Sequence, residues 1–595
     1  MVRIHVRLDL EHEGGHAGLG RGHQPLVGRL GARRRRHGRE RIEQIADAEI
    51  LQRAAEEDRR QMAFGECTRI ERLAGVAHKI EFPAQCRGVE IGIESGEFGD
   101  GHLAKLAGQV KAKRDRRSTR SDWMAIERER GISVVTSVMT FEYDGRVFNL
   151  LDTPGHEDFS EDTYRTLTAV DSAVMVIDAA RGIEPRTRKL FEVCRLRDIP
   201  IITFINKMDR ESRDPFDLID EIEKTLALDA APVTWPIGRG RDFIGTMDVK
   251  SGGVRLLDGD AGAAGSLRLM SIAELAAAHQ NLDAAAFTEE LDLVRHGCKP
   301  FDLQAFTEGH MTPILFGSAL KNFGVGDLLN ALGALALPPR AQSADQRTVA
   351  ATEPSMSAFV FKIQANMDPN HRDRIAFVRL CSGKLTRGMK VTQVRTGKTI
   401  GLHAPQFFFA QDRALAEEAY AGDVVGIPNH GTLRIGDTLT DGEKINFAGV
   451  PNFAPEILRR VRLPDAMRAK KLKQALQQLA EEGVAQVFRP TDGSPALVGV
   501  VGPLQLEVLK ARLHAEYDIE IGWDTPEFQF ARWITADDPK ILDRFVNEFH
   551  SSIAEDFDGD LVFLARNAFN LEYTGDHNKE IAFSDVKDIH KREPD

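Results

Sequence analysis

The first residues that could do chemistry form the segment Asp152-Thr153-Pro154-Gly155-His156, which follows the apolar run 147–151. The run predicts a buried strand, and open α/β sheets bind ligands at the carboxyl ends of their strands. Asp152 at that end could hold Mg²⁺ through water, and the backbone N–H of Gly155 could face a γ-phosphate. His156 follows at once, where an imidazole could order an attacking water. Read alone, the Asp-x-x-Gly spacing is more typical of an ordinary turn after a strand.

A second segment, Asn206-Lys207-Met208-Asp209, follows the apolar run 200–205. The Asp209 carboxylate could accept two N–H bonds from guanine, one from N1 and one from the 2-amino group. Adenine lacks that pair of donors, so a buried carboxylate would stay unpaired, and the discrimination could reach several orders of magnitude. The Lys207 stem could cover the base plane. A helix N-cap explains the isolated tetrapeptide about as well.

Two weaker candidates complete this set of polar groups. Ser318-Ala319-Leu320 follows the predicted strand 312–317, and a backbone N–H there could bond to guanine O6. Ser133 precedes the Asp152 strand at the distance of a switch loop, where its hydroxyl could ligate Mg²⁺ together with Asp152. The alternatives are an ordinary strand-to-helix turn for the first and a surface-loop serine for the second.

The phosphate cradle that these groups would need is missing from the sequence. A Gly-x-x-x-x-Gly-Lys-Ser/Thr loop should precede the switch by several tens of residues, and residues 1–130 contain no match. The one Gly-Lys-Thr, Gly397-Lys398-Thr399, lacks the upstream glycine because Thr392 stands there, so a hairpin turn is the better interpretation. Each charge-assisted bond is worth roughly 1.5–3 kcal/mol, so nucleotide affinity should fall by orders of magnitude without the loop.

The elements that would position these groups predict a multidomain α/β protein. Alternating strands and helices over 108–337 predict a doubly wound α/β domain. An irregular insertion at about 230–300 contains one predicted Ala-rich helix, 271–286. A linker at 338–355 leads to short strands with Gly turns over 356–448, which is a β-barrel pattern. Residues 455–595 are mixed α/β.

Residues 1–107 differ in composition from the rest of the chain, being rich in Arg, Gly, His and Glu with four consecutive arginines at 33–36. Three explanations stay open: a nucleic-acid-binding arm, a solvated or disordered arm, and a frame-shifted segment that is not native coding sequence. If the cell makes the chain as recorded, the central sheet should have an unfilled strand position.

Composition limits the class of protein further. The chain has 595 residues, of which 42% are hydrophobic, and a formal net charge of −12. The negative charge argues against loose polybasic adhesion to RNA. The five cysteines have no metal or redox spacing, and no run reaches the roughly 18 apolar residues of a membrane span. The N-terminus lacks the apolar stretch of a signal peptide, so we expect a cytoplasmic protein without membrane contact. We also expect the chain to be a monomer.

Several strings resemble the translational GTPases: Arg130-Gly131-Ile132-Ser133, the Asp-Thr-Pro-Gly-His-Glu-Asp-Phe run at 152–159, and the Asn-Lys-Met-Asp run at 206–209. Longer strings are similar to the bacterial release factor 3 family, at 119–124, 159–167, 193–198, 361–369 and 451–456. The resemblance runs from about Gly108 to near the C-terminus. It implies that 108–337 is a G domain of the phosphate-loop type that lacks its first strand and phosphate loop. Elongation factor G fits less well, because too few residues follow the barrel for its extra domains.

The resemblance implies a GTPase that acts with GTP and Mg²⁺ in translation termination and promotes dissociation of class I release factors from the ribosome. It implies that His156 is the catalytic histidine, engaged by the sarcin–ricin loop of ribosomal RNA. It places Ser133 where relatives carry a magnesium-binding threonine. The implied nucleotide-binding set is Asp152, Thr153, Pro154, Gly155, His156, Asn206, Lys207, Met208, Asp209, Ser318, Ala319 and Leu320. The alternative is a non-hydrolysing ribosome-binding remnant that has lost nucleotide binding.

Overall fold

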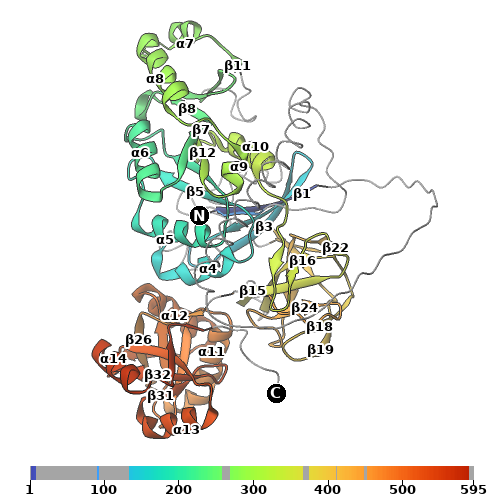
Figure 1. Ribbon diagram of the computed structural model, residues 1–595, viewed down its shortest axis with the longest axis vertical. Helices are drawn as coiled ribbons and strands as arrows, with labels where there is room; N and C mark the ends of the chain where they lie inside the picture. The colour runs from blue at the N-terminus through green and yellow to red at the C-terminus, as the bar shows by residue number, and fades with distance from the viewer. Residues whose placement is uncertain are drawn as a thin grey trace, which may run out of the picture. The chain divides into compact units, whose positions relative to one another are not determined.

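The structure is a computed structural model that describes residues 133–257, 268–279, 281–365, 374–409, 412–447, 450 and 452–587, and the backbone of 2–8 and 90–92. These residues form an α/β region, a β-rich region and a C-terminal α/β region, which follow one another along the colour bar of Figure 1. The predicted multidomain α/β class is therefore confirmed. No helix in the described ranges combines the length and the apolar character needed to cross a membrane.

The first α/β region is built on a sheet with a parallel part in the order β5-β6-β12-β7. These strands are β5 (Ala173–Asp178), β6 (Ile201–Asn206), β12 (Met311–Phe316) and β7 (Asp229–Pro232). Both faces of the sheet are covered, because neighbouring residues of β6 enter different cores. Ile205 packs in the core that contains residues of α5 (Pro185–Leu196) and α6 (Pro215–Leu226), whereas Phe204 packs in the core that contains α10 (Val325–Leu335). This is the doubly wound arrangement.

A hairpin of β3 (Ser137–Tyr143) and β4 (Arg146–Asp152) extends the sheet. Its two-residue turn, Asp144-Gly145, has positive φ at both positions, 50° and 69°. Such a turn matches the twist of the flanking strands and favours Asp-Gly, as the sequence predicts. The register pairs Ser137 with Asp152, so the hairpin holds Asp152 at the carboxyl edge of β4.

The position between β4 and β5, which the sequence predicts to be unfilled, is occupied. Strand β1 (Val2–Leu8) runs antiparallel to β4 from Val2 opposite Asp152 to Leu8 opposite Arg146, and Val2 also pairs with Val174 of β5. The short β2 (Glu90–Gly92) pairs with β1 and β4. The expectation of a gap was wrong because backbone pairing can recruit a strand from a remote part of the chain. Its direction, however, puts the start of β1 at the edge where a phosphate loop would need the end of a parallel strand.

Within its described residues, 230–257, 268–279 and 281–300, the insertion contains a four-stranded antiparallel sheet and two α-helices. Its strands are β8 (Thr234–Ile237), β9 (Gly245–Asp248), β10 (Gly253–Leu256) and β11 (Arg268–Leu269). The prediction of one helix over 271–286 is wrong, since α7 (Ile272–Ala278) ends and α8 (Ala284–Gly297) begins afresh. Asp283 caps α8, with its carboxylate accepting N–H groups of Ala285 and Ala286 at 3.0 and 3.1 Å.

The β-rich region is antiparallel, with a core of Val, Leu, Ile and Ala side chains. Its longest strands are β15 (Ser357–Ala365) and β16 (Arg374–Ser382), and the others are β17 (Lys384–Thr386), β18 (Lys390–Gln393), β19 (Lys398–Gly401), β20 (Gln406–Phe409), β21 (Asp412–Leu415), β22 (Glu418–Tyr420), β23 (Val424–Pro428) and β24 (Thr438–Thr440). Gly397 lies in the turn between β18 and β19, which pair as a hairpin. The Gly-Lys-Thr string therefore belongs to a hairpin, as predicted, with Gly397 in the turn and Lys398 and Thr399 at the start of β19.

The C-terminal region repeats one pattern twice around a sheet of order β29-β26-β28-β27-β31-β32-β30-β33. The first half consists of β26 (Ile457–Arg462), α11 (Ala469–Glu481), β27 (Gln486–Pro490), β28 (Leu497–Val500), α12 (Pro503–Tyr517) and β29 (Gly522–Asp524). The second half consists of β30 (Phe530–Thr535), α13 (Pro539–Glu548), β31 (Ile553–Glu555), β32 (Leu561–Ala565), α14 (Ala568–His577) and β33 (Ala582–Ser584). Antiparallel pairing of β27 with β31 joins the halves.

Candidate functional site

The segment that follows β4 is buried along most of its length. Asp152 is 2% exposed, and Thr153, Pro154 and Gly155 are buried as well. Ser133 is also buried, four residues before Ser137, the residue that pairs with Asp152. The structure therefore places Ser133 on the chain that leads into the neighbouring strand, in surroundings that differ from the exposed loop of the alternative interpretation.

His156 is half-exposed and caps a short 3-10 helix, Glu157–Phe159, which continues into α4 (Ser160–Leu167). Its Nδ1 lies 3.3 Å from the backbone N of Asp158 and 3.3 Å from Oδ1 of the same residue. The ring meets Phe159 edge-on at 6.2 Å between centroids. One edge of the imidazole is thus held by protein, while the side chain still reaches solvent.

The two predicted base-binding segments come together at the ends of β6 and β12. The Asn206 side-chain oxygen accepts the N–H of Lys207 at 2.8 Å and that of Ala319 at 2.9 Å. Of the backbone N–H groups in Ser318-Ala319-Leu320, the one of Ala319 is thus donated to Asn206 in this structure. Ser318 and Met208 are buried, whereas Leu320 is 55% exposed. The juxtaposition follows from parallel neighbours, whose carboxyl ends meet at one edge.

Asp209 and Lys207 differ in their partners. Oδ1 of Asp209 is buried and makes no hydrogen bond within the described part of the chain. Lys207 has a positive φ of 70°, and its Nζ lies 3.1 Å from Oδ2 of Asp178 at the end of β5. Burial would raise the pKa of Asp178, but the N–H of Ala180 and the Lys207 ammonium hold it below its ordinary value. Sequence reasoning missed Asp178, although its place at a strand end was a signal.

These residues fit one half of a guanine nucleotide. A buried carboxylate oxygen without a partner suits a ligand that brings N–H donors, since an unsatisfied buried acceptor costs free energy. Asp152 and Ser133 offer oxygen ligands of the kind that Mg²⁺ prefers. The phosphate half does not fit as well, because the sequence has no phosphate loop and β1 runs in the wrong direction to supply one.

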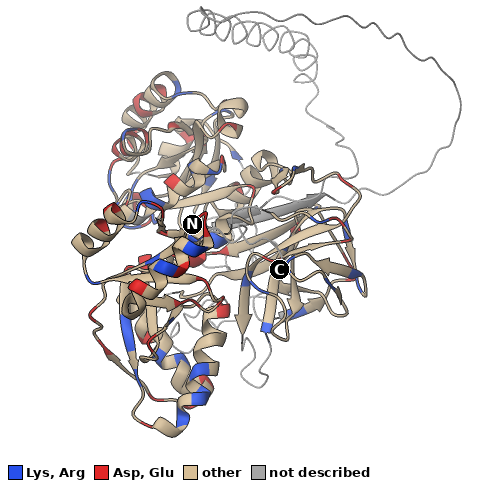
Figure 2. Ribbon diagram, turned by 60° about the horizontal axis from the view of Figure 1, so that its bottom comes forward, with Lys and Arg blue, Asp and Glu red and all other residues tan. Residues whose placement is uncertain are grey.

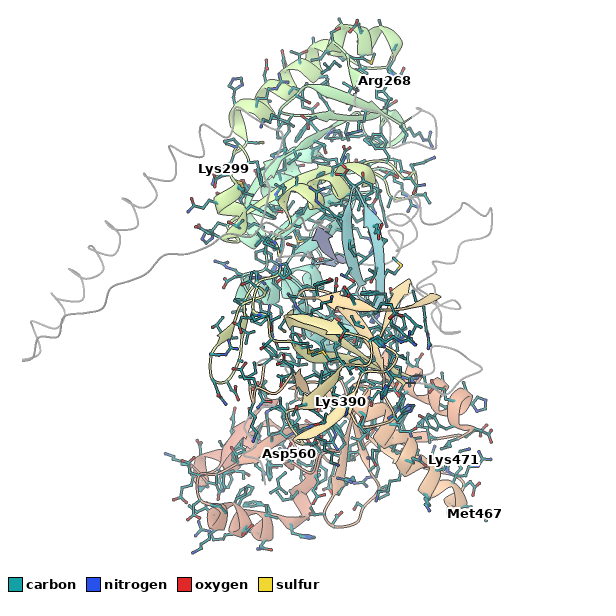
Figure 3. All side chains as sticks on the ribbon, turned by 90° about the vertical axis from the view of Figure 1, so that its right-hand side faces the viewer. Arg268, Lys299, Lys390, Met467, Lys471 and Asp560 are labelled. Carbon is teal, nitrogen blue, oxygen red and sulfur yellow. The ribbon has the colours of Figure 1, made fainter. Side chains whose placement is uncertain are left out.

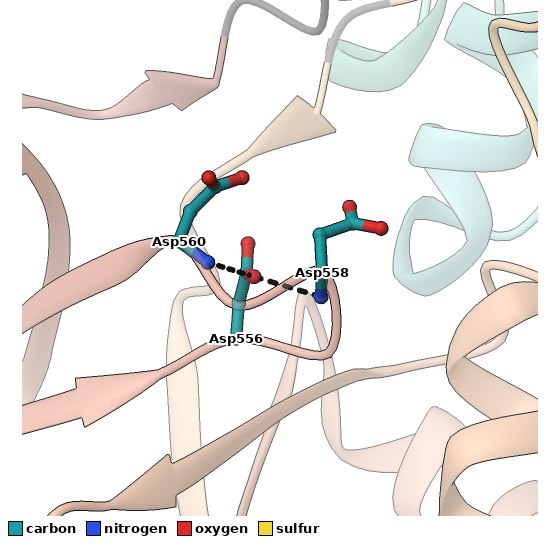
Figure 4. Close-up of side chains that lie close together, drawn as sticks. All are labelled: Asp556, Asp558 and Asp560. Atoms are coloured by element: carbon teal, nitrogen blue, oxygen red, sulfur yellow. Dashed lines mark hydrogen bonds between the residues drawn. The ribbon is translucent and has the colours of Figure 1, made fainter. Parts of the chain in front are cut away.

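A separate group of carboxylates, Asp556, Asp558 and Asp560, has the appearance of a metal centre (Figure 4), with oxygens within 4.8 Å of one another. The ammonium of Lys587 already lies among them, at 2.6, 2.7 and 2.6 Å from one oxygen of each. Burial would lower the pKa of Lys587, but these carboxylates raise it above its ordinary value. Lys587 therefore lies where a metal ion would have to bind, and its contacts with the three carboxylates hold the strand β34 (Val586–Lys587) in place.

Basic and acidic residues are both found along the described helices, as the ribbon colours of Figure 2 show. One local excess of positive charge occurs in the first turn of α11, where Lys470, Lys471 and Lys473 are all exposed. Met467, just before this turn, is 95% exposed. Figure 3 shows Met467 and Lys471 projecting outward from the C-terminal region.

Comparisons with known proteins divide the chain into three matching stretches. Residues 100–338 match the family model of the elongation factor Tu GTP-binding domain, and residues 355–442 match that of elongation factor G domain 2. Residues 447–575 match the model of the C-terminal domain of class II release factor 3. A crystal structure of a protein from Thermus thermophilus is similar with a TM-score of 0.60 and 22% identity, over 75% of this chain and 68% of that chain. At that identity the likeness shows the fold alone.

Proposed function

Because the chain is a translational GTPase of the release factor 3 type, we propose that it promotes dissociation of class I release factors from the ribosome in a GTP-dependent step. The observation that carries this proposal is the release factor 3 model over 447–575, which spans most of both halves of the C-terminal sheet. GTP-binding domains of this family bind GTP with Mg²⁺, and translational GTPases act on the ribosome, so the chemistry and the partner follow from membership.

We assign the base to the edge formed by β6 and β12. Asp209 would accept the two N–H groups of guanine, and Asn206 would hold the Ser318-Ala319 turn in place through its bond to the Ala319 N–H. Lys207, Met208 and Leu320 complete this edge. Selectivity for guanine over adenine would come from the buried Asp209 oxygen.

We assign the reaction to the segment after β4. Ser133 and Asp152 would hold Mg²⁺, and Thr153, Pro154 and Gly155 would line the phosphate side. Bound GTP with Mg²⁺ supplies the phosphoanhydride bond that is broken. His156, with one ring edge held and the other open, would orient the attacking water when the sarcin–ricin loop engages it.

The deciding experiment is a titration of the purified chain with a fluorescent GTP analogue, followed by a release-factor dissociation assay on post-termination ribosomes. The proposal would be supported if the analogue binds saturably, GTP displaces it, ATP does not, and a labelled class I factor dissociates faster in the presence of the chain. Binding of GTP without any effect on the class I factor would refute the termination role while leaving the GTPase assignment intact.

The second candidate, a nucleotide-free ribosome-binding remnant, is favoured by one observation. The sequence has no phosphate loop, and an antiparallel strand fills the position from which that loop would emerge. This candidate predicts co-sedimentation with ribosomes that is the same with and without GTP. The first candidate predicts that nucleotide changes the affinity.

A further inference from the structure

Asp158 is a buried carboxylate, 5% exposed, that touches two distant parts of the chain. Its Oδ1 lies 3.3 Å from Nδ1 of His156, and its Oδ2 accepts the backbone N–H of Leu504 at 2.6 Å. Leu504 lies in the first turn of α12, where backbone N–H groups have no partner within the helix. One carboxylate thus contacts the proposed catalytic histidine and the start of a helix in the C-terminal region.

The residue before α12 makes room for this contact. Gly502 occupies the N-cap position and has no side chain that could accept an N–H of the first turn. A Cβ at this position would overlap the Asp158 carboxyl group. Asp158 therefore serves as the cap that α12 lacks, and a negative charge at a helix N-terminus is favourable.

The contact with Asp158 also affects which ring nitrogen of His156 carries the proton. Nδ1 cannot accept the Asp158 N–H and donate to the Asp158 carboxylate at the same time, although both groups lie at 3.3 Å. A carboxylate is the stronger partner, because a hydrogen bond to a charged acceptor is roughly twice as strong as a neutral one. A proton on Nδ1 satisfies the carboxylate and leaves the lone pair on Nε2.

We propose that Asp158 is a positioning residue that fixes the tautomer of His156, and that its bond to Leu504 makes this depend on the docking of α12. This inference rests on the proposed function for its catalytic meaning. In the docked arrangement Nε2 is free to accept a hydrogen bond from water. When α12 moves away, Asp158 loses the N–H that fixes its orientation.

Asp158→Asn tests the proposal, because the amide oxygen must still face the Leu504 N–H. The amide NH₂ then faces Nδ1 of His156 and forces the proton onto Nε2. Asparagine caps helices about as well as aspartate, so α12 keeps its cap. If Asp158 served only as this cap, the substitution would have no effect on His156. The isosteric change Glu157→Gln, at the exposed neighbour, is the matched control.

The first readout needs no nucleotide. Diethylpyrocarbonate attacks the unprotonated ring nitrogen, and modification of His156 can be followed by peptide mass. We expect modification in Asp158→Asn to be several-fold slower than in the wild type and in Glu157→Gln, because the remaining lone pair faces protein. Equal rates in all three proteins would overturn the inference. If the wild-type chain fails to bind GTP, the proposed function fails, while this comparison still decides the role of Asp158.

The second readout is ribosome-stimulated GTP hydrolysis. Asp158→Asn should lower kcat about 100-fold, within the usual range for loss of a positioned acid–base group, with GTP affinity and the ribosome KM unchanged. In a His156→Ala background it should cause no further loss, since it acts through the imidazole. A wild-type kcat in Asp158→Asn, or an equal additional loss in the His156→Ala background, would contradict the proposal.

Discussion

Arg379→Met should lower the free energy of unfolding by about 3 kcal/mol, because it breaks an ion pair between the first α/β region and the β-rich region. Arg379 of β16 and Asp171, which follows α4, are both 0% exposed, and Nη2 lies 2.6 Å from Oδ2. Asp171 also accepts the backbone N–H of Arg340 at 3.0 Å. The substitution keeps an apolar stem and removes the guanidinium with its charge and its hydrogen bond to Asp171, so the carboxylate stays buried without its main partner.

The size of the expected destabilisation follows from the burial of the Arg379–Asp171 ion pair and from the contacts with Arg340 that Asp171 keeps. At an effective dielectric constant of about 20, two unit charges about 3 Å apart attract each other by roughly 5–6 kcal/mol. Removing one partner of a buried pair costs about 3–5 kcal/mol. Arg340 still lies near Asp171, with Nε 3.5 Å from Oδ1, so we expect the lower end. With an m-value of about 3 kcal/mol/M, the urea midpoint should fall by about 1 M.

Urea unfolding followed by circular dichroism measures this shift. The control is Arg347→Met, because Arg347 bonds to Glu353 and Glu443 at the surface, where an ion pair is worth roughly 1 kcal/mol or less. The double variant Asp171→Leu/Arg379→Met should regain part of the loss, since it leaves no buried charge. A midpoint shift for Arg379→Met no larger than for Arg347→Met would refute the reasoning.

Four further predictions rest on the described contacts. Asp209→Asn should weaken GTP binding and improve relative binding of xanthosine triphosphate in competition titrations, because an amide offers a donor to a 2-oxo group. Ribosome binding should weaken in the triple variant Lys470→Ala/Lys471→Ala/Lys473→Ala, and the slope of log affinity against log salt should become shallower by up to about 3. The control is the triple variant Lys390→Ala/Lys398→Ala/Lys444→Ala, whose lysines are exposed in the β-rich region, and its ribosome binding should not change. Lys587→Met should make the thermal midpoint rise with added Ca²⁺, because three carboxylates lose their shared ammonium. A midpoint that does not respond to Ca²⁺ would show that these carboxylates do not form a cation site when Lys587 is removed. Burial would raise the pKa of Asp162, but Lys362 and the Thr136 N–H hold this pKa below its usual value of 3.8. The ionised Asp162 carboxylate therefore stabilises the fold fully above the pKa of the unfolded chain. This stabilisation is lost as pH falls through the lower pKa of the folded chain. Asp162→Asn should flatten the fall of the unfolding midpoint between about pH 5 and 3, and an unchanged slope would contradict this.

Local patterns predicted the elements that carry the candidate site. The Asp144-Gly145 turn fixes its hairpin within two residues, and the apolar run before Asn206 is long enough to be a buried strand. Because neighbouring parallel strands end at one edge, the order of the motifs in the sequence was enough to bring Asn206 and Ala319 together across 113 positions. The prediction of one helix over 271–286 was wrong, because it followed the alanine content and ignored Asp283 as the N-cap of a new helix.

Contacts between distant elements could not be predicted in the same way. Asp158 and Leu504 are 346 positions apart, and Asp162 and Lys362 are 200 apart. Neither pair has a periodicity or a spacing that links it, since each depends on how whole regions pack. The pairing of β1 with β4 and β5 has the same origin, because a strand with unpaired N–H and C=O groups can pair with any strand that packing brings beside it. Tertiary packing therefore decided what the sequence pattern left open.

The segment from Asp158 to Arg165 connects these distant contacts to the proposed reaction. Asp162 accepts the N–H of Thr136 at 2.7 Å and bonds to Lys362 of β15 at 2.8 Å. Arg165 donates to the backbone oxygen of Gly483 at 3.0 Å and to Glu161 at 3.1 Å.

Burial raises the pKa of Glu161, and Arg165 opposes this, so the pair is costly to separate. Any displacement of the loop after Asp152 must exchange these buried bonds, because the loop and α4 are continuous. Under the proposed function, a displacement of this loop by nucleotide would reach all three regions through one short helix, and packing of the C-terminal region would act back on His156 by the same route.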